Sequence, residues 1–284
     1  MQHQHQQPAG LVEELRSRIA GIGRAAPPRG GAAAVIPLGV AAIDATLPGR
    51  GLACGALHEI AGTGPDVEHG AAAALLVAGL LGRSGKAGGR GTVLWIVERA
   101  DLFAPALAGV GLHPDRVILV EAGRPQAVLL AMEEGLRHPG LAGVVGELSG
   151  RFSLTVSRRL QLAAEASGVM AIALRRSRRH DDPALAEPTA AATRWRVAVL
   201  PSPPPLPEAP ETPGLGPARW RLDLARCRGG QGTAGPASGT ASWIVEACDA
   251  KGRLRLAADL ADRPAAPAPR GRAAGGPAAA DVAA

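Results

Sequence analysis

From Leu57 to Gly70 the sequence is Leu-His-Glu-Ile-Ala-Gly-Thr-Gly-Pro-Asp-Val-Glu-His-Gly. Its first four residues predict a short buried strand, and the apolar run 71–81 predicts a buried helix. The glycine-rich segment between them predicts a tight loop at the carboxyl end of the strand. A strand, a glycine-rich loop and a helix in this order are the layout of a phosphate-binding loop.

This loop lacks the side chains with which such loops hold a nucleotide. A lysine normally neutralises the β- and γ-phosphates, and the following Ser or Thr binds Mg²⁺. No G-x-x-x-x-G-K-[ST] motif occurs in the chain, and the two positions hold either Glu68 and His69 or Ala71 and Ala72, depending on the alignment. Phosphate binding would therefore depend on the backbone around three glycines, Gly62, Gly64 and Gly70. Because Asp66 and Glu68 would repel phosphate, we expect neither ATP nor Mg²⁺ as a cofactor.

Apolar strands alternate with helices on either side of this stretch, from Val35 to about Leu174. The further strands are expected at 91–98, 116–121, 141–147 and 169–174, and the further helices at 101–110, 125–137 and 153–167. Nearly continuous apolar strands separated by amphipathic helices indicate an α/β fold, with a parallel sheet covered on both faces.

The pattern changes after residue 180. Strands are expected at 194–200 and 219–226, separated by a proline-rich run at 201–217, and a β-hairpin is expected over 242–257. The predicted organisation is an N-terminal amphipathic helix (11–22) and linker in 1–34, a core in 35–180, a β extension in 181–262 and a disordered tail in 263–284. The amphipathic helix either packs on the body or docks on a partner.

Composition excludes several classes of protein. Only 2% of the 284 residues are aromatic, so the core must be aliphatic. The net charge of +6 comes almost entirely from arginine, whose codons are GC-rich, so it is weak evidence for a nucleic-acid partner. The three cysteines form no C-x-x-C motif, which argues against a zinc site or a disulfide framework. Without a signal peptide or a long apolar segment, the chain is expected in the cytoplasm with no membrane contact.

The block from Ile36 to about Leu174 resembles the core of the RecA-type ATPases. Four segments carry the resemblance in order, namely Ile36–Asp44 with Gly49–Leu52, then Glu59–Ile60, then Trp95–Ala100, and finally Leu107–Leu112 with Asp115–Ile118. The resemblance implies a RecA-like, P-loop-type parallel sheet flanked by helices, with a degenerate Walker A loop and added C-terminal antiparallel strands. It also places Glu98 where these enzymes have their catalytic glutamate, here expected to be vestigial. Gly146, next to Glu147, falls where they have the aspartate that coordinates magnesium.

A degenerate RecA-like core in a small, arginine-rich chain is similar to the ImuA family. The resemblance implies a bacterial SOS-induced accessory factor. Such factors act with ImuB, a catalytically inactive Y-family polymerase relative, and an error-prone C-family DNA polymerase in mutagenic translesion synthesis. On this basis we expect a non-enzymatic scaffold that binds an ImuB-like partner, with RecA or single-stranded DNA as further candidates. The alternatives are a weak DNA-dependent ATPase that uses Glu98 and a stand-alone DNA-binding module.

A basic cluster follows the last core strand and contains the candidate DNA contacts Arg175, Arg176, Arg178 and Arg179. In the RecA fold this segment becomes a DNA-contacting loop, and several arginines there could neutralise several phosphates. The alternative is that these arginines form a solvated run of charge, and that Asp181 and Asp182 reduce its net positive charge. Trp195 and Trp220 each lie between two arginines, but the alternation of side chains on a strand favours core packing over base stacking.

Overall fold

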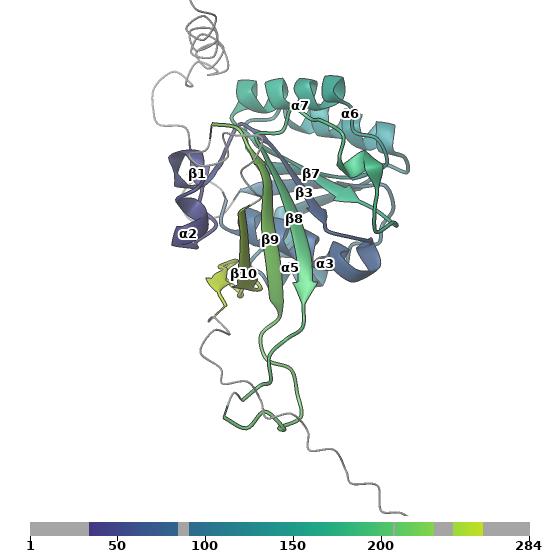
Figure 1. Cartoon of the computed structure of the whole chain (residues 1–284). Helices are drawn as coiled ribbons and strands as arrows, with labels where there is room; N and C mark the ends of the chain where they lie inside the picture. Colours follow the sequence, from purple (N-terminus) through teal and green to yellow (C-terminus); the bar gives the residue numbers. More distant parts are fainter. Residues whose placement is uncertain (1–33, 85–90, 207, 230–240, 258–284) are drawn as a thin grey trace, which may run out of the picture.

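The computed structural model describes residues 34–84, 91–206, 208–229 and 241–257, which form a twisted sheet between two helical layers (Figure 1). Within these residues the main sheet has nine strands in the order β11-β10-β9-β8-β3-β7-β6-β4-β5. Their bounds are β3 Leu57–Gly62, β4 Thr92–Val97, β5 Val117–Glu121, β6 Leu141–Ser149, β7 Met170–Arg176, β8 Thr193–Leu200, β9 Arg219–Cys227, β10 Ala241–Glu246 and β11 Arg255–Leu256. The pairings from β8 to β5 are parallel, and β9, β10 and β11 extend the sheet in antiparallel fashion.

The helices cover both faces of the sheet, as the alternating pattern predicts. Helices α3 (Asp66–Gly82) and α5 (Ala104–Ala108) lie on one face, and α6 (Pro125–Gly135) and α7 (Leu154–Ser167) lie on the other (Figure 1). The remaining described elements are β1 Val35–Ile36, β2 Leu52–Ala53, α2 Ala41–Asp44 and the short 3-10 helices Pro48–Arg50, Pro114–Arg116 and Pro183–Leu185. This architecture confirms the expected RecA-like α/β fold.

The helix after β3 begins earlier than the sequence suggested. We expected a loop up to Gly70, whereas α3 starts at Asp66 and leaves only 63–65 outside regular structure. Pro65 occupies the N-cap position, and the carboxylates of Asp66 and Glu68 lie in the first turn, where the helix dipole favours negative charge. The acidic residues thus belong to the beginning of a helix, and the loop is short.

Strand alternation correctly predicted the environment of the two arginine-flanked tryptophans. Trp195 and Trp220 are buried in the core on the α3 side of the sheet, so neither can stack on a base. Trp195 also contacts Trp243, with ring centroids 6.2 Å apart.

The C-terminal hairpin expected over 242–257 is formed by β10, which ends at Glu246, and β11, which begins at Arg255. The connecting turn packs closely on α3 through glycine. A Cβ atom on Gly79 would lie 2.6 Å from the Sγ atom of Cys248, and Gly252 has a φ of +69°. The C-terminal strands are therefore joined to the core by tight backbone packing as well as by the sheet.

The predicted helix at 11–22 and the predicted tail at 263–284 lie outside the described residues. Among the residues that are described, no helix is long and apolar enough to cross a membrane. No cluster of His, Cys, Asp and Glu in the same ranges could hold a metal ion.

Candidate functional site

A cavity of about 940 Å³ opens at the carboxyl edge of the parallel strands. Charged side chains dominate its lining, among them Asp66, Glu98, Asp101, Glu147, Arg176 and Arg178. They come from the ends of β4, β6 and β7 and from the beginning of α3. The carboxyl edge of a parallel sheet is where α/β proteins usually bind ligands, so this cavity is the candidate functional site.

Arg176 occupies the centre of the charged cluster in this cavity. Its guanidinium forms ion pairs with Asp66 (Nε–Oδ2, 2.9 Å), Glu147 (Nη1–Oε2, 2.9 Å) and Asp101 (Nη2–Oδ2, 3.3 Å). Burial alone would lower the pKa of Arg176, but the surrounding carboxylates, Glu147 first, raise it on balance. The arginine therefore remains charged and joins β7 to α3, to β6 and to the segment after β4.

Glu147 is the buried member of this cluster. Its carboxylate accepts a hydrogen bond from the indole Nε1 of Trp95 at 2.8 Å and pairs with Arg176 on its other oxygen. Burial raises the pKa of Glu147, and the charge of Arg176 opposes that rise. The preceding residue is a glycine, and a Cβ atom on Gly146 would overlap the Sδ atom of Met132 on α6. An aspartate at this position would require the Met132 side chain to shift.

The loop glycines pack against side chains and carbonyl groups of the chain itself. A Cβ atom on Gly62 would meet the Cβ of His69 at 2.7 Å, and one on Gly64 would lie within 3.4 Å of His69 and His180. Gly70 lies within α3, and a Cβ atom on this residue would lie 3.0 Å from the Cβ atom of Asp66. The first N–H group of α3, on Asp66, donates to the carbonyl of Ser177 at 2.7 Å. The first N–H group of the helix is thus engaged within the protein and is not free to bind a phosphate.

Glu98 lies where the resemblance places the catalytic glutamate, directly after β4. The side chain is half-buried and faces the cavity. One carboxylate oxygen accepts hydrogen bonds from the backbone N–H of Ser149 at 2.8 Å and from its hydroxyl at 2.7 Å. The hydroxyl also reaches the second oxygen at 3.0 Å, so Ser149 holds this carboxylate in place.

The structure separates the four arginines that the sequence grouped as DNA contacts. Arg175 and Glu59 both have side chains that are 0% exposed, so the prediction of a DNA contact is wrong for Arg175. Arg176 is 25% exposed and is engaged with carboxylates. Only Arg178 and Arg179 are exposed, at the rim of the cavity. Alternation along β7 causes the separation, because neighbouring residues of a strand face opposite sides of the sheet.

Arg175 belongs to a second charged cluster, around Glu59 on the α7 side of the sheet. The Glu59 carboxylate lies 3.2 Å from Arg194, 3.6 Å from Arg175 and 3.9 Å from Arg196. It also accepts a hydrogen bond from the Thr189 hydroxyl at 2.8 Å. Burial lowers the pKa of both Arg175 and Arg196, and the nearby carboxylate of Glu59 opposes that effect. One carboxylate thus balances part of the charge of three arginines.

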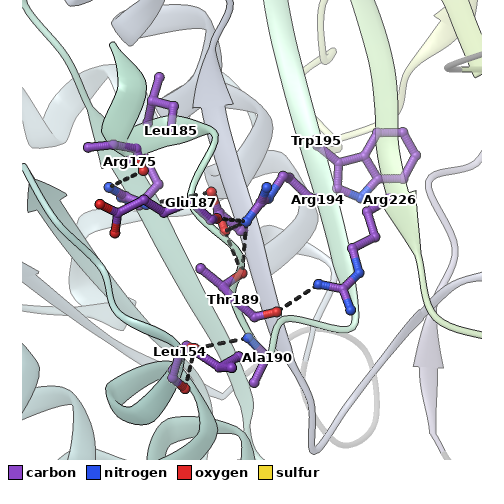
Figure 2. Close-up of polar contacts among 12 residues, drawn as sticks. Leu154, Arg175, Leu185, Glu187, Thr189, Ala190, Arg194, Trp195 and Arg226 are labelled. Carbon is purple, nitrogen blue, oxygen red and sulfur yellow. Dashed lines mark hydrogen bonds and ion pairs between the residues drawn. The ribbon is translucent and has the colours of Figure 1, made fainter.

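Four arginines hold the segment between β7 and β8, namely Arg194 and Arg196 of β8, Arg226 of β9 and Arg228 just after β9. Figure 2 shows Arg194 and Arg226 among them. Each bonds a different backbone carbonyl: Arg196 that of Leu185 (2.6 Å), Arg194 that of Glu187 (2.6 Å), Arg226 that of Thr189 (2.7 Å) and Arg228 that of Ala190 (2.8 Å). The signal for this cluster in the sequence is Glu59, a charged residue inside a strand that is predicted to be buried. Much of the basic character therefore serves the fold.

Comparison with known proteins agrees with this architecture. The chain is 39% identical to Protein ImuA of Caulobacter vibrioides in two strains, NA1000 / CB15N and ATCC 19089 / CIP 103742 / CB 15. Each match extends over 249 residues and covers 84% of this chain and 95% of the relative. No protein-family model matches the chain.

Among solved structures, the chain resembles the crystal structure of the RadB recombinase. The TM-score is 0.51 at 15% identity, and the match covers 78% of this chain and the whole of the other. At this identity the likeness concerns the fold alone.

Proposed function

The chain belongs to the ImuA family, and on this premise we propose that it is a non-enzymatic accessory protein of SOS-induced, error-prone translesion DNA synthesis. Its partner would be an ImuB-like relative of the Y-family polymerases, which brings it together with an error-prone C-family polymerase. RecA and single-stranded DNA are further candidates for binding. This function places the protein in the cytoplasm, with the chromosome. The relative in Caulobacter and the RecA-like fold support the proposal.

The observation that carries the non-enzymatic assignment is the engagement of Arg176 with three carboxylates. A phosphate-binding site needs positive charge that is free to meet the ligand, and a magnesium site needs carboxylates that are free to coordinate the ion. Here Arg176 is engaged by the carboxylates of Asp66 and Glu147, and neither carboxylate is free of this ion pairing. Nucleotide binding would have to break these ion pairs and displace His69 from the loop, without a lysine to compensate. A scaffold that keeps its shape without ATP or Mg²⁺ fits this arrangement.

Titration calorimetry of the full chain with Mg²⁺ and a non-hydrolysable ATP analogue tests this assignment. The titration is run with the chain alone and with the purified ImuB-like partner. We expect a Kd above about 1 mM in both cases, which corresponds to only about 4 kcal/mol of binding free energy. Saturable micromolar binding in either titration would overturn the non-enzymatic assignment. A complex with the partner that fails to form at low salt would instead overturn the accessory role.

A weak ATPase is the second candidate, favoured by the position of Glu98 and Glu147 in the cavity of about 940 Å³. This function predicts ATP turnover that is lost in Glu98→Gln and kept in Glu121→Gln, a matched change at the exposed end of β5. Turnover that persists in Glu98→Gln would mark a contaminating enzyme. The hydrogen bonds from Ser149 to Glu98 count against this candidate, because they occupy the oxygens that would activate water.

If this face of the protein contacts DNA, Arg178 and Arg179 are the residues that make the contact. Both are exposed beside the cavity, and neither forms an ion pair within the described residues. Asp182 also lines the cavity and weakens the positive potential there. We therefore propose a weak, salt-sensitive contact with the DNA backbone as an aid to assembly, with no base recognition.

A further inference from the structure

The connection between β8 and β9 projects from the body of the protein as an arm. The two strands pair up to Leu200 and Arg219, and the chain beyond this pair extends past the end of the sheet (Figure 1). We call residues 201–206 and 208–218 the β8–β9 arm. No described residue of the arm is buried, so the arm contributes nothing to the core.

The arm nevertheless has a defined shape. The backbone N–H of Gly216 donates to the carbonyl of Pro203 at 2.8 Å, which ties the two limbs of the arm together. A Cβ atom on Gly216 would lie 2.8–2.9 Å from the carbonyl oxygens of Pro203 and Pro204, so only glycine fits there. At the tip, the backbone N–H groups of Ala209 and Thr212 donate to the carbonyls of Leu206 (3.2 Å) and Ala209 (3.0 Å). Prolines in both limbs restrict the backbone further.

The arm also presents apolar side chains that the protein leaves in water. Leu215 is 83% exposed and Leu206 is 44% exposed. Exposed leucines on a rigid, proline-rich segment resemble the ligands of aromatic-lined grooves, which bind such segments at a small entropic cost. The charges within the described arm are Glu208 and Glu211, both negative, although the whole chain carries a net charge of +6. The matching surface would therefore combine an aromatic-lined groove with a basic rim.

We propose that the β8–β9 arm is the element that docks on the polymerase-like partner. Leu206 and Leu215 fill an apolar groove of that protein, and Glu208 and Glu211 face basic side chains at its rim. The inference rests on the proposed function, because it names the surface through which that partner is bound. A second copy of this chain is the competing occupant, since its body is basic as well.

The experiment measures the affinity of the full chain for the purified ImuB-like partner by biolayer interferometry. The test variant is Leu206→Ser/Leu215→Ser, and the matched control is Leu154→Ser/Leu162→Ser, which changes two leucines of α7 that are also exposed. We expect the Kd to rise about tenfold to hundredfold in the test variant, because two buried leucines are lost from the interface. The control should bind within about twofold of the wild type. A second variant, Glu208→Lys/Glu211→Lys, should weaken binding most strongly at low salt.

The outcomes separate the inference from the function on which it rests. If the wild type binds the partner and the test variant binds equally well, the arm is not the docking element and the proposed function stands. If the wild type does not bind the partner at all, both proposals fail. Sedimentation velocity tests whether a second copy of this chain binds the arm instead of the partner. Self-association that is lost in the test variant, with partner binding unchanged, would assign the arm to a second copy of this chain and overturn the proposal.

Discussion

Arg175 and Arg176 are neighbours on β7, yet they lie in opposite kinds of environment. Arg175 points to the α7 side, where it meets Glu59 out of contact with water. Arg176 points to the carboxyl-edge cavity, where it joins three carboxylates and stays partly solvated. The comparison shows that a run of arginines in a sequence is no measure of a DNA-binding surface. The face of the strand decides whether an arginine holds the fold, closes a cavity or meets a ligand.

The two clusters also differ in how much stability the protein loses when one charged partner is removed. In the closed Glu59 cluster water cannot replace a missing charge, so an unpaired ion remains desolvated. In the open Arg176 cluster water and a change of protonation can compensate. Loss of a charge should therefore destabilise the protein more in the closed cluster than in the open one.

Substitution Glu59→Gln should have the largest effect. It leaves the guanidinium groups of Arg175, Arg194 and Arg196 without their shared carboxylate charge. We expect the free energy of unfolding to fall by about 3–5 kcal/mol, the usual cost of breaking a buried ion pair. Urea denaturation measures the loss, with Glu121→Gln as the exposed control. A loss below about 1 kcal/mol would show that water reaches this cluster and that the contrast with the open cluster is false.

Acid should destabilise the protein through His58, the residue before Glu59, which faces the other side of β3. Its Nδ1 and Nε2 atoms bond Thr193 Oγ1 at 2.8 Å and the carbonyl of Ala53 at 2.9 Å, and burial lowers its pKa from 6.5 to about 4. Between these values the unfolded chain binds the proton and the folded chain does not. The stability present above pH 6.5 is therefore lost as the pH falls, by about 3 kcal/mol at pH 4.

Urea denaturation at pH 7 and pH 4 measures this effect in the wild type and in His58→Gln. The decrease in stability should be smaller in the variant by about 3 kcal/mol. An exposed histidine, changed in His113→Gln, provides the control and should leave the pH dependence as it is. Equal pH dependence in the wild type and His58→Gln would mean that the ring can take up a proton in the folded protein.

Substitution Arg176→Met should have a moderate effect on stability, about 1–3 kcal/mol at pH 8, because the carboxylates of its cluster are partly solvated. Removing the cation leaves burial to raise the pKa of Glu147 further. A carboxyl group with a folded pKa above its unfolded value stabilises the fold as the pH falls, so the defect should shrink at pH 5. Arg178→Met is the control. Recovery of stability on adding Mg²⁺ and ATP would instead point to a nucleotide site.

Substitution Arg178→Ser/Arg179→Ser should have the smallest effect on stability, within about 0.5 kcal/mol, because both side chains are exposed. If these residues contact single-stranded DNA, the slope of log K against log salt should decrease in magnitude by about 1.4, or about 0.7 for each phosphate contact. Fluorescence anisotropy with a labelled oligonucleotide measures the slope. The control Arg124→Ser/Arg137→Ser removes the same charge at the two ends of α6. An equal change in both variants would show that only net charge matters.

Much of the fold could be predicted because apolar periodicity marks buried strands and helices directly. The beginning of α3 could not be placed, since Asp66 and Glu68 suit a loop and a helix N-terminus equally well. Within the site, Glu98 was found through the resemblance of Trp95–Ala100 to the RecA-type ATPases. The partners of Arg176 were not found, because Asp66, Asp101 and Glu147 are far apart in the sequence. Their meeting depends on the parallel order of the strands.

Side chains alternate along every strand, so Arg175 and Arg176 face opposite sides once both belong to β7, but the sequence predicted this strand only to residue 174 and missed their separation. The sequence was enough to predict the helical and strand pattern of the core. It also determined the missing lysine, the aliphatic core and the buried tryptophans. Only the tertiary structure decided which carboxylates each arginine meets, since strands β3, β6 and β7 become neighbours only after the sheet has formed. The same holds for the exposed β8–β9 arm, because a proline-rich segment can pack or project, and the surrounding fold determines which.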